Sequence, residues 1–388
     1  MNLYAFELGR KKELCAAELI ALFGEENIVE NSHSCPIFKM DKIDPISLQN
    51  ILGGTIRIIE IHSELPVSSY HSKITPAIEE MLTDTFKADG TKVPFAVNSF
   101  GFKNRHDINI KELLKNSKKI LKSLGINSRF VNQNFTENPS PATIFKAYVL
   151  EKGIDISVIK GIKTVYVGKT VSIQNIDEYS KRDFGKPRKD AHVGMMPPKV
   201  AQIMINLAGP NTKTIYDPFC GTGTTLIEGL LMGKSVVGSD IDKRMTEMSA
   251  ENVKWAIQEY RLDSKFRVFQ KDAQFITKQD LKENVDAVVT EGHLGNPVSR
   301  LPSAEERAKT FRELSNLHLN WLKNIHSITS KDCKVIMCVG GFRTEKALEH
   351  LPKFEEIAKL AGYKVSKIFT YDRKDQVVIR DIKVLEKL

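Results

Sequence analysis

Apolar and polar residues follow strand and helix periods from the start of the chain. Over residues 1–70 they predict, in order, a strand, a helix, two strands, a helix and a strand, at residues 3–8, 12–23, 27–30, 35–40, 45–52 and 56–64. This βαββαβ order is the split βαβ arrangement. Many unrelated functions use it, so the order alone assigns none.

A second group of elements follows up to residue 175. The predicted helices are residues 76–81 and 110–124, and the predicted strands are residues 93–98, 155–159 and 164–167. These elements predict a small α/β unit. The polar positions of its second helix hold lysines, at Lys111, Lys115, Lys118, Lys119 and Lys122. We therefore expect that helix to present a basic face.

Helix and strand alternate regularly from residue 198 onward. The predicted strands are residues 214–216, 235–239, 266–270, 286–290, 334–339, 364–370 and 376–385. The predicted helices are residues 199–207, 224–232, 243–261, 305–328 and 345–361. Such alternation predicts a Rossmann-like α/β fold with a mostly parallel, doubly wound sheet. The last two strands form a terminal hairpin, which places one antiparallel strand in that sheet.

The loop after the first of these strands contains two glycines, and residues 217–225 read Asp-Pro-Phe-Cys-Gly-Thr-Gly-Thr-Thr. A dinucleotide-binding loop requires a third glycine where this chain has Leu226. A phosphate-binding P-loop ending near residue 235 requires a glycine where it has Glu228. Both phosphate-binding interpretations therefore fail.

An adenosine ligand without phosphates fits the remaining pattern. Asp240 stands at the carboxyl end of the next strand, where ligands bind in open α/β sheets. Its carboxylate can accept from two ribose hydroxyls while the methionine portion of S-adenosylmethionine passes over Gly221 and Gly223. Asp272, after the third strand, can accept from the adenine amino group or can instead cap the next helix. The alternative for the whole segment is an ordinary strand-to-helix turn with an exposed aspartate.

The segment from Asp217 to Thr225 resembles the first motif of class I methyltransferases that modify amino groups of nucleic-acid bases. Together with the segment before it and the N-terminal half, the chain is most similar to the THUMP-containing tRNA guanine-N2 methyltransferases. This resemblance implies S-adenosylmethionine as cofactor. The expected cofactor contacts are Asp217, Phe219, Cys220, Gly221, Gly223, Thr224, Asp240, Ile241, Asp272 and Ala273.

The resemblance also implies four parts. They are a ferredoxin-like domain (1–70), a THUMP-like RNA-binding domain (71–175), a basic linker (176–195) and a methyltransferase domain (196–388). In the family, the THUMP domain grips the acceptor end of tRNA. RNA, and tRNA in particular, is therefore the expected partner.

Basic charge is concentrated in the middle of the chain. Residues 91–195 hold 19 Lys and Arg against 9 Asp and Glu, whereas residues 1–90 hold 8 against 14. A concentrated basic surface is the footprint of a polyanion, because each neutralised phosphate releases counterions. A solvated lysine-rich face is the alternative. The residues expected to contact RNA are Lys118, Lys119, Lys122, Tyr179, Arg182 and Arg188.

Five basic residues of the linker fall between residues 181 and 189, together with Gly185 and Pro187. Proline and glycine disfavour a regular element, so the segment predicts an exposed loop. Such a loop is either a solvated hinge or a strap that contacts phosphates, with Tyr179 and Phe184 as stacking surfaces.

The motif after the fourth strand departs from the family. Relatives carry Asp or Asn, two prolines and an aromatic residue, which accept the amino hydrogens and stack on a flipped base. Residues 291–297 here read Glu-Gly-His-Leu-Gly-Asn-Pro. We predict Glu291 as the catalytic acceptor and His293 as the stacking face, although Gly292 cannot fix its carbonyl as proline does. Three possibilities stay open: Glu291 accepts the amino proton, another atom does, or activity is lost.

Other features narrow the class of function. Five cysteines are scattered without a CxxC pair, which favours neither a disulfide framework nor a zinc site, and no metal is expected. Since no apolar run reaches the ~18 residues of a membrane span and no signal peptide is recognisable, we expect a cytoplasmic protein without a membrane partner.

A DNA amino-methyltransferase and a catalytically inactive RNA-binding protein remain as alternatives. The pattern leaves open the need for a partner subunit, as well as the RNA and the nucleotide.

Overall fold

The structure is a computed structural model that describes residues 1–86, 92–104, 107–190, 195–373 and 376–388. The chain divides into two compact units, Met1–Asp177 and Glu178–Leu388. Part of the predicted linker, residues 191–194, lies outside the described residues. No helix in the described ranges is both long enough and apolar enough to cross a membrane.

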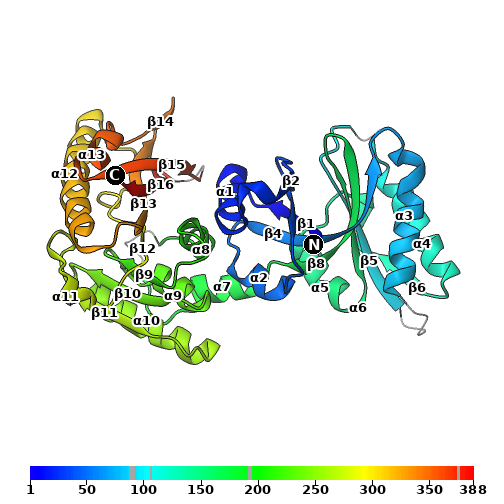
Figure 1. The fold of residues 1–388 in the computed structure, drawn as a ribbon, viewed down its shortest axis with the longest axis horizontal. Coiled ribbons are helices and arrows are strands. Elements are labelled where there is room, and N and C mark those ends of the chain that lie inside the picture. Colours follow the sequence, from blue (N-terminus) through cyan, green and yellow to red (C-terminus); the bar gives the residue numbers. More distant parts are fainter. Residues whose placement is uncertain (87–91, 105–106, 191–194, 374–375) are drawn as a thin grey trace. The chain divides into compact units, whose positions relative to one another are not determined.

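The first unit is built around one sheet. Its strands are β1 (Asn2–Leu8), β2 (Ile28–Glu30), β3 (Ile37–Met40), β4 (Thr55–Pro66), β5 (Lys92–Phe100), β6 (Asn127–Phe130), β7 (Ile154–Lys160) and β8 (Thr164–Ile173). Its helices are α1 (Lys12–Phe23), α2 (Pro45–Ile51), α3 (Tyr70–Thr85), α4 (Ile110–Ser123), α5 (Pro141–Lys146) and α6 (Val149–Lys152), with the short 3₁₀ turns η1 (Glu25–Asn27) and η2 (Gln133–Phe135). The strands are ordered β2-β3-β1-β4-β8-β7-β5-β6 (Figure 1).

Strand β4 joins the two predicted N-terminal domains. It pairs antiparallel with β1 on one edge and with β8 on the other, so the sheet continues across the predicted boundary at residue 70. The first six elements keep the predicted βαββαβ order. Residues 1–70 and 71–175 therefore contribute to one compact unit, while their ferredoxin-like and THUMP-like identities stay predictions.

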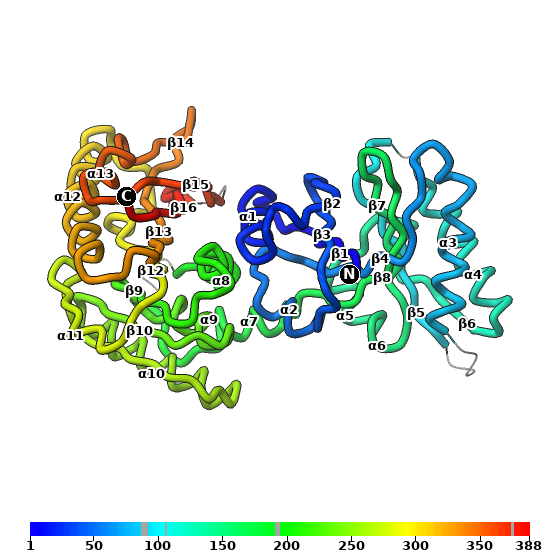
Figure 2. Tube along the Cα trace, in the orientation of Figure 1, coloured from blue at the N-terminus to red at the C-terminus, as the bar shows by residue number. Residues whose placement is uncertain are grey.

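Helices α3 and α4 lie side by side on this unit, as Figure 2 shows. Apolar residues of both helices, such as Ile78 and Leu114, are buried in a core with Val97 of β5 and Val158 of β7. The hydrophobic stripe of α4 thus faces the sheet. Its lysines are consequently turned to solvent.

A buried ionic cluster lies within the sheet. The Arg57 guanidinium is 1% exposed and donates to Asp155 Oδ2 at 2.8 Å and to Asn98 Oδ1 at 2.9 Å. Arg57 also lies 2.5 Å from Glu7 Oε2, and Thr170 Oγ1 donates to Asp155 Oδ2 at 2.7 Å. These residues come from β1, β4, β5, β7 and β8. One arginine therefore connects strands from both predicted N-terminal domains.

The second unit contains a second sheet. Its strands are β9 (Thr214–Asp217), β10 (Ser235–Asp240), β11 (Phe266–Gln270), β12 (Ala287–Thr290), β13 (Lys334–Arg343), β14 (Leu348–Glu349), β15 (Tyr363–Tyr371) and β16 (Val378–Lys387). Its helices are α8 (Pro198–Leu207), α9 (Thr224–Leu231), α10 (Lys243–Tyr260), α11 (Lys278–Leu281), α12 (Ala304–Ile328) and α13 (Phe354–Leu360), with the 3₁₀ turn η3 (Ala273–Phe275). Helix α7 (Ile176–Phe184) spans the boundary between the units.

The sheet of the second unit has the order β11-β10-β9-β12-β13-β16-β15. Strands β9 to β13 are parallel to their neighbours in this order, and β16 is antiparallel to both β13 and β15. Helices α12 and α13 cover one face, and α8 and α9 the other (Figure 1). The predicted doubly wound sheet with one inserted antiparallel strand is therefore confirmed.

Two predicted elements need correction. Helix α7 continues to Phe184, so residues 181–184 are helical rather than part of an exposed loop. The helix ends before Gly185, where a Cβ would lie 2.5 Å from the Lys181 carbonyl oxygen. Helix α13 begins only at Phe354, not at residue 345, because Pro352 disfavours helical backbone before it.

We predict that Arg57→Met lowers the free energy of unfolding by about 3 to 5 kcal/mol, because fully buried Asp155 would lose its cationic partner. Urea unfolding of the full chain measures the loss. Arg129→Met, at an exposed arginine of the same sheet, should change it by less than about 0.5 kcal/mol. Equal losses in the two variants would contradict the prediction.

Candidate active site

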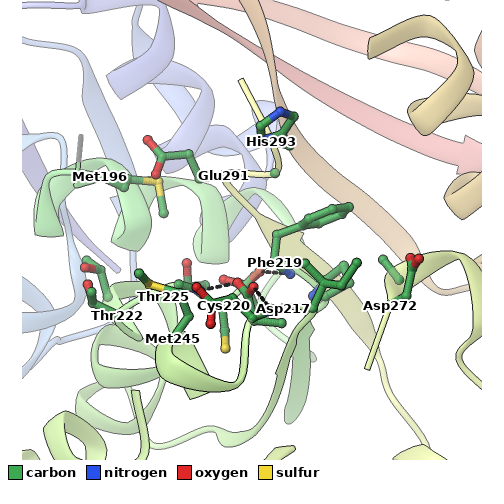
Figure 3. A pocket seen from close by; sticks show the side chains of 18 of the residues that line it. Met196, Asp217, Phe219, Cys220, Thr222, Thr225, Met245, Asp272, Glu291 and His293 are labelled. Carbon is green, nitrogen blue, oxygen red and sulfur yellow. Dashed lines mark hydrogen bonds between the residues drawn. The ribbon is translucent and has the colours of Figure 1, made fainter. Parts of the chain in front are cut away.

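A cavity of about 490 Å³ lies where β9, β10, β11 and β12 end at their carboxyl edge. Every predicted cofactor contact except Gly223 lines it, and so do both predicted catalytic residues, Glu291 and His293. Figure 3 shows Glu291 on one side of the cavity and Cys220 and Thr222 of the glycine loop across from it. The structure thus brings residues from four strand ends into one site.

The glycine loop connects β9 to α9. Gly221 and Gly223 both have positive φ, of 49° and 85°, which L side chains rarely adopt. A Cβ on Gly223 would also lie 2.6 Å from Ser249 Oγ of α10. Gly223 is therefore needed for the packing of the loop against α10, even though it does not line the cavity.

Asp240 is hydrogen-bonded to the glycine loop. Its Oδ2 accepts from Gly221 N at 3.0 Å, and its Oδ1 accepts from Asp242 N at 3.0 Å. Burial raises the pKa of the Asp240 carboxyl. Because a carboxylate has about four acceptor positions, both oxygens can still accept from a ligand. The two sequence features that predicted an adenosine ligand are thus in direct contact.

Asp217 forms part of the cavity floor. It is 2% exposed, and its Oδ1 accepts from Phe219 N at 3.1 Å. Burial raises the pKa of this carboxyl to about 7. The Phe219 ring stands edge-on to Trp321, with 5.5 Å between ring centroids, which fixes this wall of the cavity. Asp217 therefore stabilises the conformation of the glycine loop through its hydrogen bond to the Phe219 backbone.

The sequence left two roles open for Asp272, a helix cap and a contact to the ligand, and its position is consistent with both. Its Oδ1 accepts from Gln274 N at 2.9 Å, so it caps the short turn η3. It also lines the cavity beside Ala273. A capping role and a ligand contact are therefore compatible at this residue.

Glu291 is paired with an arginine that the sequence did not indicate. Its Oε1 accepts from Arg380 Nε at 2.6 Å, and the Arg380 side chain is 7% exposed. Burial raises the pKa of Glu291, and the Arg380 charge opposes that effect. Because 89 residues separate the two, no local pattern could have identified the pair.

His293 lies at the border of the cavity and is exposed. Its side chain and that of Glu291 diverge in Figure 3. Partial desolvation lowers the pKa of its imidazole, so the neutral ring is favoured. A neutral planar ring is suited to the predicted stacking role, which stays a prediction.

Two linker residues expected to contact RNA are engaged inside the second unit. Arg182 is 8% exposed, and its Nε lies 2.9 Å from Glu228 Oε1. The Tyr179 hydroxyl donates to Gln202 Oε1 at 2.5 Å, and its ring lies 4.3 Å from the Arg182 guanidinium carbon. These contacts favour a structural role for both residues, because a buried ion pair would have to break before Arg182 met a phosphate.

Residues 186–188 of the basic linker are attached to the glycine loop and to α10. Lys186 is buried, and its Nζ donates to Thr224 Oγ1 at 3.0 Å. Fully buried Asn252 accepts from Arg188 N at 2.8 Å and donates to Thr222 O at 2.9 Å. The Arg188 side chain is exposed, and its Nε lies 2.6 Å from Glu251 Oε2 of α10. No local pattern identifies Asn252, since its partners lie on distant segments.

The predicted RNA-contacting lysines of α4 belong to the first unit. Lys118, Lys119 and Lys122 are exposed, and Lys118 Nζ lies 5.9 Å from the centre of the Phe130 ring. This surface combines positive charge with an aromatic ring. The structure agrees with the basic face expected for this helix.

Comparison with known proteins supports a methyltransferase. The model of a family described as "RMKL-like, methyltransferase domain" matches residues 186–360, and a model described as "DNA methylase" matches residues 68–251. The crystal structure of TrmN from Thermus thermophilus covers 100% of this chain and 99% of its own, with a TM-score of 0.53 and 15% identity. At that identity the likeness shows the fold alone.

Curated relatives specify the family further. A tRNA (guanine(10)-N2)-dimethyltransferase from Methanothermobacter thermautotrophicus is 41% identical over 147 residues, which are 36% of this chain and 41% of the relative. The chain thus spans less than half of that relative's length. A protein named as a probable tRNA (guanine(10)-N2)-dimethyltransferase from Methanothermococcus thermolithotrophicus is 34% identical over 28% of this chain and 67% of its own length. The chain therefore belongs to the family of S-adenosylmethionine-dependent methyltransferases that includes these tRNA relatives.

Proposed function

We propose that this protein transfers a methyl group from S-adenosylmethionine to a base amino group of RNA, with guanine N2 in tRNA as the target. The observation that carries the proposal is that Asp240, the glycine loop and Glu291 line the same cavity. A cofactor contact and a proton acceptor thus face the same space. Similarity to the tRNA (guanine(10)-N2) relatives supports the choice of target.

The residues around the cavity fit the cofactor. Asp240 is proposed to accept from the ribose hydroxyls, Asp272 from the adenine amino group, and the Gly221 backbone to follow the methionine portion. When bound, S-adenosylmethionine supplies a methyl group on a sulfonium, and its transfer to the amino nitrogen leaves a neutral thioether and releases one proton from nitrogen. The protein therefore has to orient the base, exclude water and accept that proton.

Glu291 is proposed to accept the proton. It is the carboxylate at the end of β12 that lines the cavity, and family members carry their acceptor at the same strand end. Asp217 lies deeper, is 2% exposed and accepts from the loop backbone. Its pKa near 7 reflects burial rather than access to a substrate.

A DNA amino-methyltransferase is the second candidate. The "DNA methylase" model matches residues 68–251, and such enzymes act on the same kind of exocyclic amino group. The exposed lysine face of α4 suits either nucleic acid, and the similarity to the tRNA (guanine(10)-N2) relatives favours RNA. Tritium transfer from labelled S-adenosylmethionine to tRNA and to DNA distinguishes the two, and binding without transfer to either would indicate an inactive RNA-binding protein.

Asp240→Ala should weaken the binding of S-adenosylhomocysteine by at least about tenfold. Each hydrogen bond to a charged group contributes about 1.5 to 3 kcal/mol, and tenfold corresponds to about 1.4 kcal/mol. Isothermal titration calorimetry measures the change. Asp263→Ala, at an exposed aspartate of the loop before β11, is the matched control and should bind as the wild type does. Unchanged affinity in Asp240→Ala would remove that residue from the site.

Glu291→Gln should reduce methyl transfer to RNA by about 10² to 10⁴-fold, the usual contribution of a positioned acid or base, while the affinity for S-adenosylhomocysteine is retained. The amide keeps the size of the side chain but cannot accept a proton. His293→Ala should raise the apparent KM for RNA. Glu283→Gln, at an exposed glutamate before β12, is the control and should leave the rate unchanged. A wild-type rate in Glu291→Gln would mean that another atom accepts the proton.

Replacing Lys118, Lys119 and Lys122 together by alanine should weaken RNA binding across sequences and flatten its salt dependence. Each lost phosphate contact lowers the log-log slope by about one unit. The control replaces three exposed lysines of the second unit, Lys346, Lys353 and Lys359. If both triple variants gave the wild-type slope, the basic face of α4 would be merely solvated.

A further inference from the structure

The antiparallel strand β16 brings an arginine to the ligand edge of the sheet. In register, Gly340 of β13 is paired with Arg380, and Thr290 at the end of β12 is paired with Met337. Because β16 runs opposite to β13, its first residues lie where the parallel strands end. Arg380 is thus placed beside the carboxyl ends of the strands, although it comes from the last strand of the chain.

Gly340 allows the loop that carries Glu291 to lie close to β13 and within reach of Arg380. A Cβ on Gly340 would overlap the carbonyl oxygen of Leu294, so a larger residue there would displace the loop that carries Glu291. With glycine in place, Arg380 Nε donates to Glu291 Oε1 at 2.6 Å. Arg380 Nη1 also lies 3.5 Å from Gln376 Oε1, which helps to hold the guanidinium.

This contact occupies one oxygen of the carboxylate. A carboxylate offers about four acceptor positions on two oxygens, so Glu291 keeps capacity for an amino hydrogen while Arg380 holds it. The side chains are 7% and 19% exposed, and hydrogen bonds between such desolvated charged groups fix geometry more firmly than exposed ones do. Arg380 itself is not among the residues that line the cavity.

The charges around Glu291 are unevenly distributed over the elements that face it. Arg380 of β16 and Lys186 of the segment after α7 are the cations that favour its ionised form. Burial favours its neutral form, and the nearby Cys338 thiol of β13 has a pKa raised by burial and therefore stays uncharged. Only the ionised carboxylate can accept a proton, so the cations oppose a burial effect that would disable it.

We infer that Arg380 is the positioning residue for Glu291, holding its carboxylate at the cavity wall and keeping it ionised for proton acceptance. The inference rests on the proposed function of Glu291 and adds to it a residue that acts through Glu291. A glutamate is one methylene longer than the family's aspartate, and the pair with Arg380 fixes the position of that longer side chain. The proton leaves the amino nitrogen for a carboxylate oxygen of Glu291 and passes from there to water.

The test is the pH profile of methyl transfer to RNA in Arg380→Met. Loss of the cation raises the pKa of Glu291, so less carboxylate is ionised at a given pH and the acidic limb of kcat moves to higher pH, by about 1 to 3 units. The variant should therefore lose at least tenfold in kcat near pH 6 and recover much of it near pH 9. Two results would overturn the inference. A loss of kcat by the same factor at every pH would indicate a purely structural role for Arg380. A gain in kcat would indicate that the ion pair with Arg380 inhibits Glu291.

Two further variants separate positioning from folding. Arg307→Met removes an arginine that pairs with Glu349 at 2.7 Å and does not line the cavity, and it should leave the acidic limb in place. Arg380→Lys keeps the charge but loses the geometry of the guanidinium, so its acidic limb should stay near wild type while kcat falls about tenfold and KM for RNA is unchanged. If Arg380→Met does not fold, a kcat of Arg380→Lys within twofold of wild type is the result that overturns the inference.

A second readout does not require transfer. The carboxyl ¹³C resonance of Glu291, assigned by its absence in Glu291→Gln, should titrate at higher pH in Arg380→Met than in the wild type. Absence of transfer by the wild type to any RNA would refute the proposed function, whereas an unmoved titration midpoint would refute the role of Arg380.

Discussion

The hydrogen bond from Gly221 N to Asp240 Oδ2 connects the two parts of the proposed cofactor site, the glycine loop and the end of β10. It joins the loop after β9 to the end of β10, two parallel neighbours whose carboxyl ends share one edge of the sheet. The loop can follow this path because Gly221 and Gly223 adopt positive φ, and α10 can approach because Gly223 has no side chain. The cavity walls supplied by Asp217, Asp272 and Glu291 are arranged around this contact.

Buried arginine and carboxylate pairs recur in both units. Arg57 with Asp155, Arg182 with Glu228 and Arg380 with Glu291 each join segments that are distant in sequence. Removing charges from water is costly, so such pairs persist only with good geometry and further hydrogen bonds. Arg57 meets this condition within a sheet core, whereas Arg380 meets it at the edge of a cavity. The same kind of ion pair therefore connects strands in one unit and, in the other, holds the carboxylate that we propose as the proton acceptor.

The distribution of basic residues illustrates how burial changes the meaning of charge. The segment from residue 91 to 195 is the most basic of the chain, yet its lysines and arginines have different surroundings. Lys118, Lys119 and Lys122 are exposed on α4, while Lys186 and Arg182 are buried against the threonines of the glycine loop and Glu228. Counting charges thus identified a basic region but could not separate the residues that face solvent from those that pack against the proposed cofactor site.

Local pattern determined most of the elements, and it predicted which ligand the glycine loop binds. Periodicity identified the strands and helices, and the spacing of Gly221, Gly223 and Asp240 indicated the ligand class, because these signals lie within single strand, loop and helix units. Tertiary structure alone decided that β4 joins both N-terminal segments in one sheet, that α7 continues through the basic linker, and that Arg380 pairs with Glu291. Each of these depends on which strands become neighbours and which side chains lose water. Those are properties of the assembled sheet, and no window of neighbouring residues contains them.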